Sequence, residues 1–168
     1  MTLSMYQASV PVFTRMLGNL AAILTKAGAH ASARKIEPAT LLGMRLFPDM
    51  FPLTRQVQLS ADFAKNTTAR LAGVEIPKFA DEETSFPELQ QRIAKTLDFL
   101  KGFRSAQIDG SETRDISLTI GGETIAFKGQ DYLLNFALPN FYFHVTTAYD
   151  VLRHGGLDVG KRDFIGMR

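Results

Sequence analysis

The amino-acid sequence predicts a mainly α fold: a four-helix bundle with a small β-hairpin inserted before the last long helix. Three observations predict it. Apolar residues recur at helical spacing in four segments, glycines and prolines separate these segments, and one stretch near residue 120 alternates like a strand. With 168 residues, 45% of them hydrophobic, the chain is long enough for one domain, residues 1–168, with a sizeable core.

The first predicted helix has an apolar stripe that steps alternately by four and three residues between positions 6 and 27. Pro11 lies inside this pattern, and a proline in a helix interior removes a hydrogen bond and clashes with the preceding turn. We therefore expect a kink at Pro11 or a helix start near Ser9. Gly28 is expected to end the helix, and residues 29–47 to form a connection with at most a short helical turn.

The second predicted helix opens in the segment PDMFP, residues 48–52, and runs to Gly73. Residues 74–84, VEIPKFADEET, contain a proline and an acidic run and are expected to be a solvated linker. Ser85 and Glu88 then match the S-x-x-E capping box, with leucine and isoleucine residues at helical spacing behind it. This pattern predicts a third helix that ends around Gly102.

The segment DISLTIGGETIAFKG, residues 115–129, predicts a two-residue hairpin turning at Gly121 and Gly122. Its alternation places the isoleucine, leucine and phenylalanine side chains on one face. Because an isolated hairpin is marginally stable in water, that face should lie on the helical core. The last helix should begin near Gln130, be interrupted by Pro139, and end at residues 155–156, two glycines.

Composition excludes several function classes. The formal net charge is +2 and the basic residues are spread along the chain, which argues against nucleic acid or an anionic membrane as a partner. The chain has no cysteine, so thiolate metal sites and cysteine nucleophiles are excluded. The N-terminal segment lacks a secretory signal pattern, and no window approaches the roughly 18 apolar residues that span a bilayer. We expect a cytoplasmic protein without a membrane partner.

Two of the three histidines, His144 and His154, fall in the predicted last helix. On an α-helix they are separated by roughly 80° around the axis and about 15 Å along it, so they cannot bind one ion together. His144 lies beside the apolar stripe, either as a buried, hydrogen-bonded side chain or as a pocket residue that binds a ligand or acts as an acid or base. His154 suits the helix C-terminus, four residues after Asp150. His30 is expected in an exposed loop.

Three segments, MYQASVPVFTRML, RLFPDMFPLTRQVQ and ALPNFYFHVTTAYDVLRHGG, resemble a bacterial family of unknown function within the DinB/YfiT-like superfamily. The resemblance spans essentially the whole chain and implies a four-helix bundle that often dimerises. Many members of the superfamily bind a divalent metal through three histidines, one on the second helix and an H-x-x-x-H pair on the last. Some of these metalloenzymes transfer low-molecular-weight thiols to electrophiles.

This chain departs from the three-histidine pattern that the resemblance implies. His144 matches one position of the last-helix pair, but Ala148 stands at the other. The second helix has no histidine, and Gln56 is the residue at the matching level. We therefore expect no metal cofactor; zinc, nickel or manganese bound through His144 and an unusual ligand set remains the alternative.

If the pocket of the superfamily persists without its metal, it lies between the second and last helices, with the first helix as a wall. Gln56 and His144 are the main candidates, because a buried amide facing an imidazole needs partners that a ligand could supply. Arg45 and Asp49 are one helical turn apart and could instead pair with each other. The full set of candidate ligand-binding residues is Tyr6, Arg45, Asp49, Arg55, Gln56, Asn140, His144 and Tyr149.

Three function hypotheses follow. The first is a small-molecule-binding or stress-associated protein that keeps the bundle without the three-histidine site. The second is an enzyme of the thiol-transferase type, dependent on His144 or on a divalent metal. The third is a structural interaction protein, a homodimer formed through the wide first-helix stripe at Met16 and Ile23. No nucleotide-binding, zinc-protease or serine-hydrolase motif is present in the sequence.

Overall fold

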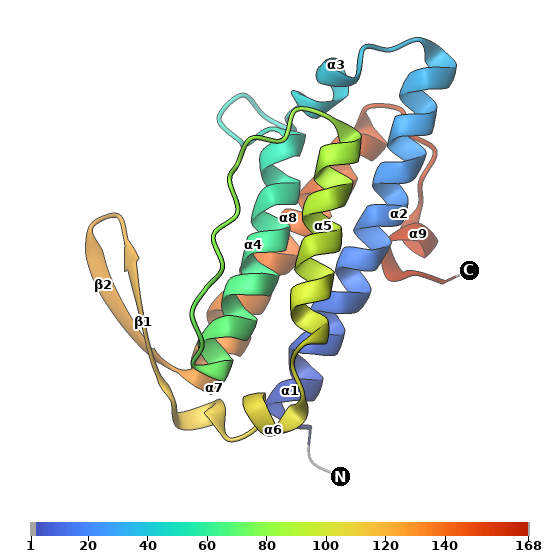
Figure 1. The fold of residues 1–168 in the computed structure, drawn as a ribbon. Coiled ribbons are helices and arrows are strands. Elements are labelled where there is room, and N and C mark those ends of the chain that lie inside the picture. Colours follow the sequence, from blue (N-terminus) through green and yellow to red (C-terminus); the bar gives the residue numbers. More distant parts are fainter. Residues whose placement is uncertain (1–2, 168) are drawn as a thin grey trace.

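The computed structural model describes residues 3–167 and has four long helices in a bundle, as the sequence predicts (Figure 1). Around the core, α2 contacts α5, α5 contacts α4, α4 contacts α8 and α8 contacts α2. Helices α4 and α5 run in the same direction, so the segment between them returns along the length of the bundle (Figure 1). The four helices are α2 (Val10–Arg34), α4 (Leu53–Ala72), α5 (Phe86–Lys101) and α8 (Leu138–His154).

One continuous cluster of buried apolar side chains joins the four helices. Phe13 of α2 packs edge-on against Phe141 of α8, with ring centroids 4.9 Å apart. Burial of this apolar area is the main stabilising contribution to such a bundle. The cluster also contains residues of the short elements α3 (Pro38–Leu42) and α6 (Ser105–Ile108).

The start of α2 confirms one prediction, and its end corrects another. A short helix, α1 (Met5–Ala8), precedes Ser9, the N-cap of α2, and Pro11 lies in the first turn, where the missing N–H does no harm. Gly28 does not end the helix, which continues to Arg34 and stops at Lys35, a residue with φ of 54°. A Cβ at Gly28 would lie 3.9 Å from the ring of Phe86, so packing of α5 against α2 outweighs the low helix propensity of glycine.

The remaining helix boundaries follow local signals. Helix α4 begins after Pro52 and ends at Gly73, which has φ of 70°, as predicted. Ser85 caps α5 by accepting a hydrogen bond from the N–H of Glu88. The Glu88 carboxylate accepts from the N–H of Thr84 at 2.7 Å, one residue before the position that a regular capping box uses.

The predicted hairpin is present as β1 (Asp115–Ile120) and β2 (Glu123–Lys128), with Ile120 opposite Glu123 across a two-residue turn. It lies beside α4 and projects from the bundle (Figure 1). Ile116 and Leu118 are buried at its base, whereas Ile120 and Ile125 near the tip are about two-fifths exposed. The apolar face therefore rests on the helical core only at the base.

The last helix is assembled from three pieces, α7 (Gly129–Asp131), a π-helical segment η2 (Tyr132–Ala137) and α8. Pro139 lies in the first turn of α8, directly after the π-helical segment. This arrangement accommodates a proline that has no N–H to donate. The chain continues through residues 155–160 to α9 (Lys161–Ile165), which packs on α2, where Asn19 donates a hydrogen bond to the carbonyl of Phe164.

The stretch Met5–Arg34 is long and apolar enough, by length and composition, to cross a membrane, which corrects the expectation that no window approaches such a span. Its mean hydropathy over 18 residues is 1.2. Phe13, Leu17 and Leu20 within it are fully buried against the other helices. This burial is typical of the core helix of a soluble bundle.

Candidate functional site

The candidate site is formed where α4 and α8 pack together, and its centre is a hydrogen bond between Gln56 and His144. The Oε1 atom of Gln56 lies 2.8 Å from Nδ1 of His144, although 88 residues separate them in the chain. Both side chains are buried: Gln56 is 1% exposed and His144 is 8% exposed. The structure therefore brings into contact the two residues that the sequence singled out as the main candidates.

A second hydrogen bond determines which tautomer His144 adopts. The Nε2 group of Gln56 donates to the backbone carbonyl of Phe51 at 3.1 Å, which directs Oε1 toward the imidazole. An amide oxygen can only accept a hydrogen bond, so Nδ1 of His144 must carry the proton and donate. The other ring nitrogen, Nε2, then keeps its lone pair and can accept a hydrogen bond from a ligand.

Aromatic side chains hold the imidazole in place. The ring of Phe63, on α4, stacks on His144 with centroids 5.5 Å apart and an angle of 22°. Phe143 meets the imidazole edge-on at 5.3 Å. Phe63 follows Gln56 by seven residues, two turns along α4, so both project from the same side of that helix.

Burial lowers the pKa of His144 to about 4, and the positive charge of Arg55 acts in the same direction. At neutral pH the imidazole is therefore uncharged. A carboxylate at position 56 would have stabilised the imidazolium, but the Gln56 amide offers only a neutral oxygen. The pair is consequently a neutral hydrogen-bonding unit.

These residues do not fit the three-histidine metal site of the superfamily. Gln56 occupies the second-helix position with its oxygen already hydrogen-bonded, and Ala148, one turn after His144, is fully buried and has no donor atom. Within residues 3–167, no group of three or more histidine, aspartate or glutamate side chains lies close enough to hold an ion. Asp62, a conceivable substitute ligand, instead pairs with Lys65 at 3.1 Å and Arg92 at 3.0 Å.

A groove of about 330 Å³, here called the α4 groove, runs along α4 beneath the hairpin. Neither Gln56 nor His144 lines it, and Phe63, which lines the groove and stacks on His144, connects the groove to the pair. Its lining is divided equally between apolar and polar residues, and all the polar ones except Thr119 come from α4. The lining residues are Arg55, Leu59, Asp62, Phe63, Asn66 and Arg70 of α4, Leu118, Thr119 and Ile120 of β1, and Phe136.

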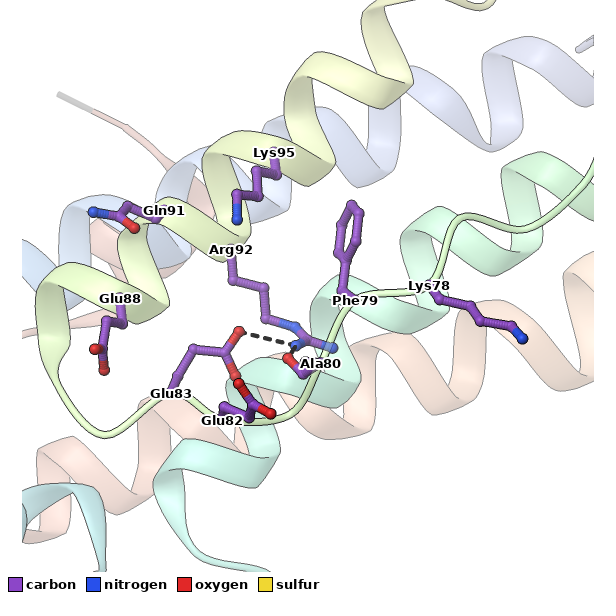
Figure 2. Close-up of a pocket in the computed structure, with 9 residues that line it drawn as sticks. All are labelled: Lys78, Phe79, Ala80, Glu82, Glu83, Glu88, Gln91, Arg92 and Lys95. Atoms are coloured by element: carbon purple, nitrogen blue, oxygen red, sulfur yellow. Dashed lines mark hydrogen bonds and ion pairs between the residues drawn. The ribbon is translucent and has the colours of Figure 1, made fainter.

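The segment between α4 and α5, residues 74–84, has no helix or strand and no buried residue, as expected for the linker that its composition predicts. This segment, here called the strap, is tied to the bundle through Arg92 of α5, whose side chain is 1% exposed. Arg92 contacts Glu83 at 2.9 Å and donates to the carbonyl of Ala80 (Figure 2). It also contacts Asp81 at 2.9 Å. The acidic run is thus a set of partners for buried cations.

Arg55 connects the strap to the site. Its Nη1 atom pairs with Oδ2 of Asp81 and lies 3.2 Å from Oε1 of Gln58. Since Arg55 also lines the α4 groove and precedes Gln56 directly, one side chain belongs to both the strap contact and the groove.

Comparison with known proteins places the chain in a family. The sequence model of a family described as a domain of unknown function, DUF1993, matches residues 5–165. The chain belongs to this family. A DinB family member protein from Shewanella denitrificans, known from a crystal structure, shares 42% sequence identity with it; the match covers 97% of this chain and 92% of that one, with a TM-score of 0.87. No curated protein matches the chain.

The DUF1993 chain is thus a DinB-like helical-bundle protein, and its fold agrees with the resemblance seen in the sequence. Of the other predicted site residues, Arg55 is next to the pair and Asn140 is one turn before His144. The Nδ2 group of Asn140 donates to the carbonyl of Phe136, also a groove residue, at 2.7 Å.

The remaining four predicted site residues of the DUF1993 chain do not line the α4 groove. Tyr6 belongs to α1, the short helix at the end of the bundle opposite α3 (Figure 1), and donates its backbone N–H to the carboxylate of Asp109. Tyr149 packs edge-on against Phe164, a residue of α9. Arg45 donates to the carbonyl of Met50 rather than pairing with Asp49, which is exposed. Proximity along a helix did not predict these contacts.

The other two histidines also have clear positions. His154 is the last residue of α8, as expected for a side chain that favours a helix C-terminus. His30 lies inside α2, not in a loop, because that helix continues past Gly28. Neither lines the α4 groove.

Sequence reasoning missed Phe63, Phe136 and the strap residues Asp81 and Glu83. The seven-residue spacing between Gln56 and Phe63 was available in the sequence and could have identified the stacking residue. No local signal could have identified Asp81, because its partners Arg55 and Arg92 come from two helices on either side of the strap in sequence.

Proposed function

We propose that this DinB-like protein binds a small molecule in the α4 groove without the three-histidine metal site of the superfamily. The observation that carries the proposal is the hydrogen bond between Gln56 and His144. It occupies the imidazole nitrogen Nδ1 with an amide and leaves the lone pair of Nε2 free, while Phe63 joins the imidazole to a groove lined by apolar and polar residues in equal number. Ligand sites typically combine apolar walls with a few placed polar groups.

The low pKa of His144 favours binding over acid–base catalysis. A general base works best when its pKa lies near the operating pH, and a group with a pKa of about 4 holds a proton weakly at neutral pH. A neutral imidazole is instead a good fixed acceptor for an N–H or O–H group. A His144-dependent enzyme of the thiol-transferase type is the second candidate, supported by the lone pair that remains on Nε2.

A homodimer remains part of the proposal, but the first-helix stripe cannot form its interface. Met16 is 7% exposed and Ile23 is 1% exposed, so both pack within the chain. A charged residue at either position would disrupt the core, not a subunit contact. Size-exclusion chromatography with light scattering tests the dimer directly. The cytoplasmic location and a stress-associated role rest on the sequence alone.

The test is a thermal-shift screen of small molecules, followed by native mass spectrometry of the hits. The diagnostic variant is His144→Asn, whose side-chain amide can still donate to Gln56 but lacks the Nε2 acceptor. We expect hits that raise the Tm of the wild-type protein and lose this effect in His144→Asn. His154→Asn is the matched control, because it makes the same change away from the groove.

Elemental analysis of untagged protein, purified without chelator and re-exposed to zinc, nickel and manganese, completes the test. The proposal expects no stoichiometric ion after dialysis. Retention of about one ion per chain that disappears in His144→Asn would refute the metal-free site and favour the metal-dependent enzyme.

A further inference from the structure

We propose that the ligand of the α4 groove is an organic acid with a flat apolar body, and that its carboxylate displaces Asp81 from Arg55. This inference rests on the proposed binding function and adds the chemical class of the ligand and a competing group within the chain. Three features carry it: the charge of the groove, the hydrogen bonds of Arg55 and the second partner of Asp81.

The charged groups that line the groove favour an anion. Arg55 and Arg70 supply two positive charges, and Asp62 supplies the only carboxylate among the lining residues. That carboxylate is already paired with Lys65 and Arg92, at 3.1 Å and 3.0 Å. An acid that enters the groove therefore meets arginine side chains and a compensated aspartate.

Arg55 retains donors that face no partner in the part of the chain that the structure describes. Both of its hydrogen bonds there, to Asp81 and to Gln58, use Nη1. A guanidinium has five N–H donors arranged to bind a carboxylate through two parallel hydrogen bonds. The contact with Asp81 uses only part of that capacity.

Asp81 can release Arg55 and keep a partner. Its Oδ2 atom pairs with Arg55, whereas its Oδ1 atom lies 2.9 Å from Nη2 of the buried Arg92. The side chains of Arg55 and Asp81 are 33% and 42% exposed, and ion pairs with this exposure contribute little to stability. Exchange of Asp81 for a ligand carboxylate therefore leaves no buried charge unpaired.

The rest of the groove suits a flat apolar body. Its apolar lining includes Leu59, Phe63, Phe136 and Ile120, and Ile120 is 43% exposed. Aromatic rings in offset or edge-on contact add to the free energy of apolar burial. A volume of about 330 Å³ is at the lower end for small-molecule sites, so the acid should be no larger than two fused rings.

Isothermal titration calorimetry with 2-naphthoate and its neutral analogue 2-naphthamide tests the inference. The variants are Arg55→Gln, Asp81→Asn and, as a matched control on an exposed arginine outside the groove, Arg34→Gln. We expect 2-naphthoate to bind wild-type protein at least tenfold more tightly than 2-naphthamide. Arg55→Gln should weaken 2-naphthoate binding tenfold or more, and Arg34→Gln should leave it unchanged.

Asp81→Asn decides whether the aspartate competes with the ligand. It removes the competing charge while Arg92 keeps Asp62 and Glu83, so the strap should stay folded and 2-naphthoate affinity should rise at least threefold. Circular dichroism verifies the fold of each variant. Unchanged or weaker binding in a folded Asp81→Asn protein would overturn the competition.

The failure of this inference differs from that of the proposed function. Equal affinities for 2-naphthoate and 2-naphthamide, both lost in His144→Asn, would refute the acid preference and support the binding site. Failure of both compounds to bind would also refute the ligand class, and the proposed function would then be decided by the other hits of the thermal-shift screen.

Discussion

Acidification should destabilise the protein through His144, and the size of the effect can be worked out from its pKa. The ordinary pKa of 6.5 applies to the unfolded chain, and burial lowers the value to about 4 in the fold. The unfolded state therefore binds the proton more tightly. The contribution of neutral His144 is fully present above about pH 6.5 and is lost as the pH falls toward 4.

At pH 5, protonation of His144 raises the equilibrium constant for unfolding by a factor of about 30, which lowers the unfolding free energy by about 2 kcal/mol. Urea unfolding followed by far-UV circular dichroism at pH 7.5 and at pH 5 measures this loss. Because other groups also titrate, the relevant quantity is the difference in unfolding free energy between wild type and His144→Asn, since asparagine does not titrate at this position. A difference that changes by less than about 0.5 kcal/mol between the two pH values would refute a depressed pKa.

Three further predictions concern the core, the strap and the positions that correspond to a three-histidine site. Gly28→Ala should raise the unfolding free energy by about 0.5–1 kcal/mol in urea titrations, because the new Cβ meets Phe86 at an ordinary contact distance of 3.9 Å. A loss of stability would show that α2 and α5 pack more closely at this position than an alanine side chain allows. Arg92→Met should lower the unfolding free energy by about 3 kcal/mol or more in the same assay, since three carboxylates lose a buried partner. Arg92→Lys, which keeps the charge, should lower it less, and equal losses of stability in the two variants would indicate that Arg92 acts through packing and not through its charge. The double variant Gln56→His/Ala148→His should bind about one zinc or nickel ion per chain by elemental analysis, whereas the control Gln56→Ala/Ala148→Ser should bind none. A folded double-histidine protein without metal would show that these positions do not have the geometry that a metal site requires.

Most helix and strand boundaries were predictable because their signals are local. A capping residue, a proline in a first turn or a glycine with positive φ acts within four residues of its own position, as at Ser85, Pro11 and Gly73. Gly28 failed as a stop signal because its conformation there depends on Phe86, a residue of another helix. Tertiary packing overrode a propensity of about 1 kcal/mol.

Gln56 and His144 could be selected from the sequence as candidates, but neither their contact nor its surroundings could be predicted. Gln56 and His144 stood at matching levels of two helices that the resemblance placed side by side. Tyr6 and Tyr149 also lay beside apolar stripes, but a stripe does not tell which neighbouring helix a side chain meets. Tyr149 consequently faces α9, and Tyr6 lies at the far end of the bundle.

The sequence by itself determined the four amphipathic helices, the two-residue hairpin and the presence of a single histidine, His144, where the resemblance implies three. These properties depend on residue identity and on spacing within a few turns. Only the tertiary structure decided that Gln56 makes His144 a neutral Nδ1 donor, and that Arg55 links the groove to the strap through Asp81. Desolvation and Coulomb interactions depend on atoms that segments far apart in the chain bring within a few ångströms, so neither could be predicted from spacing.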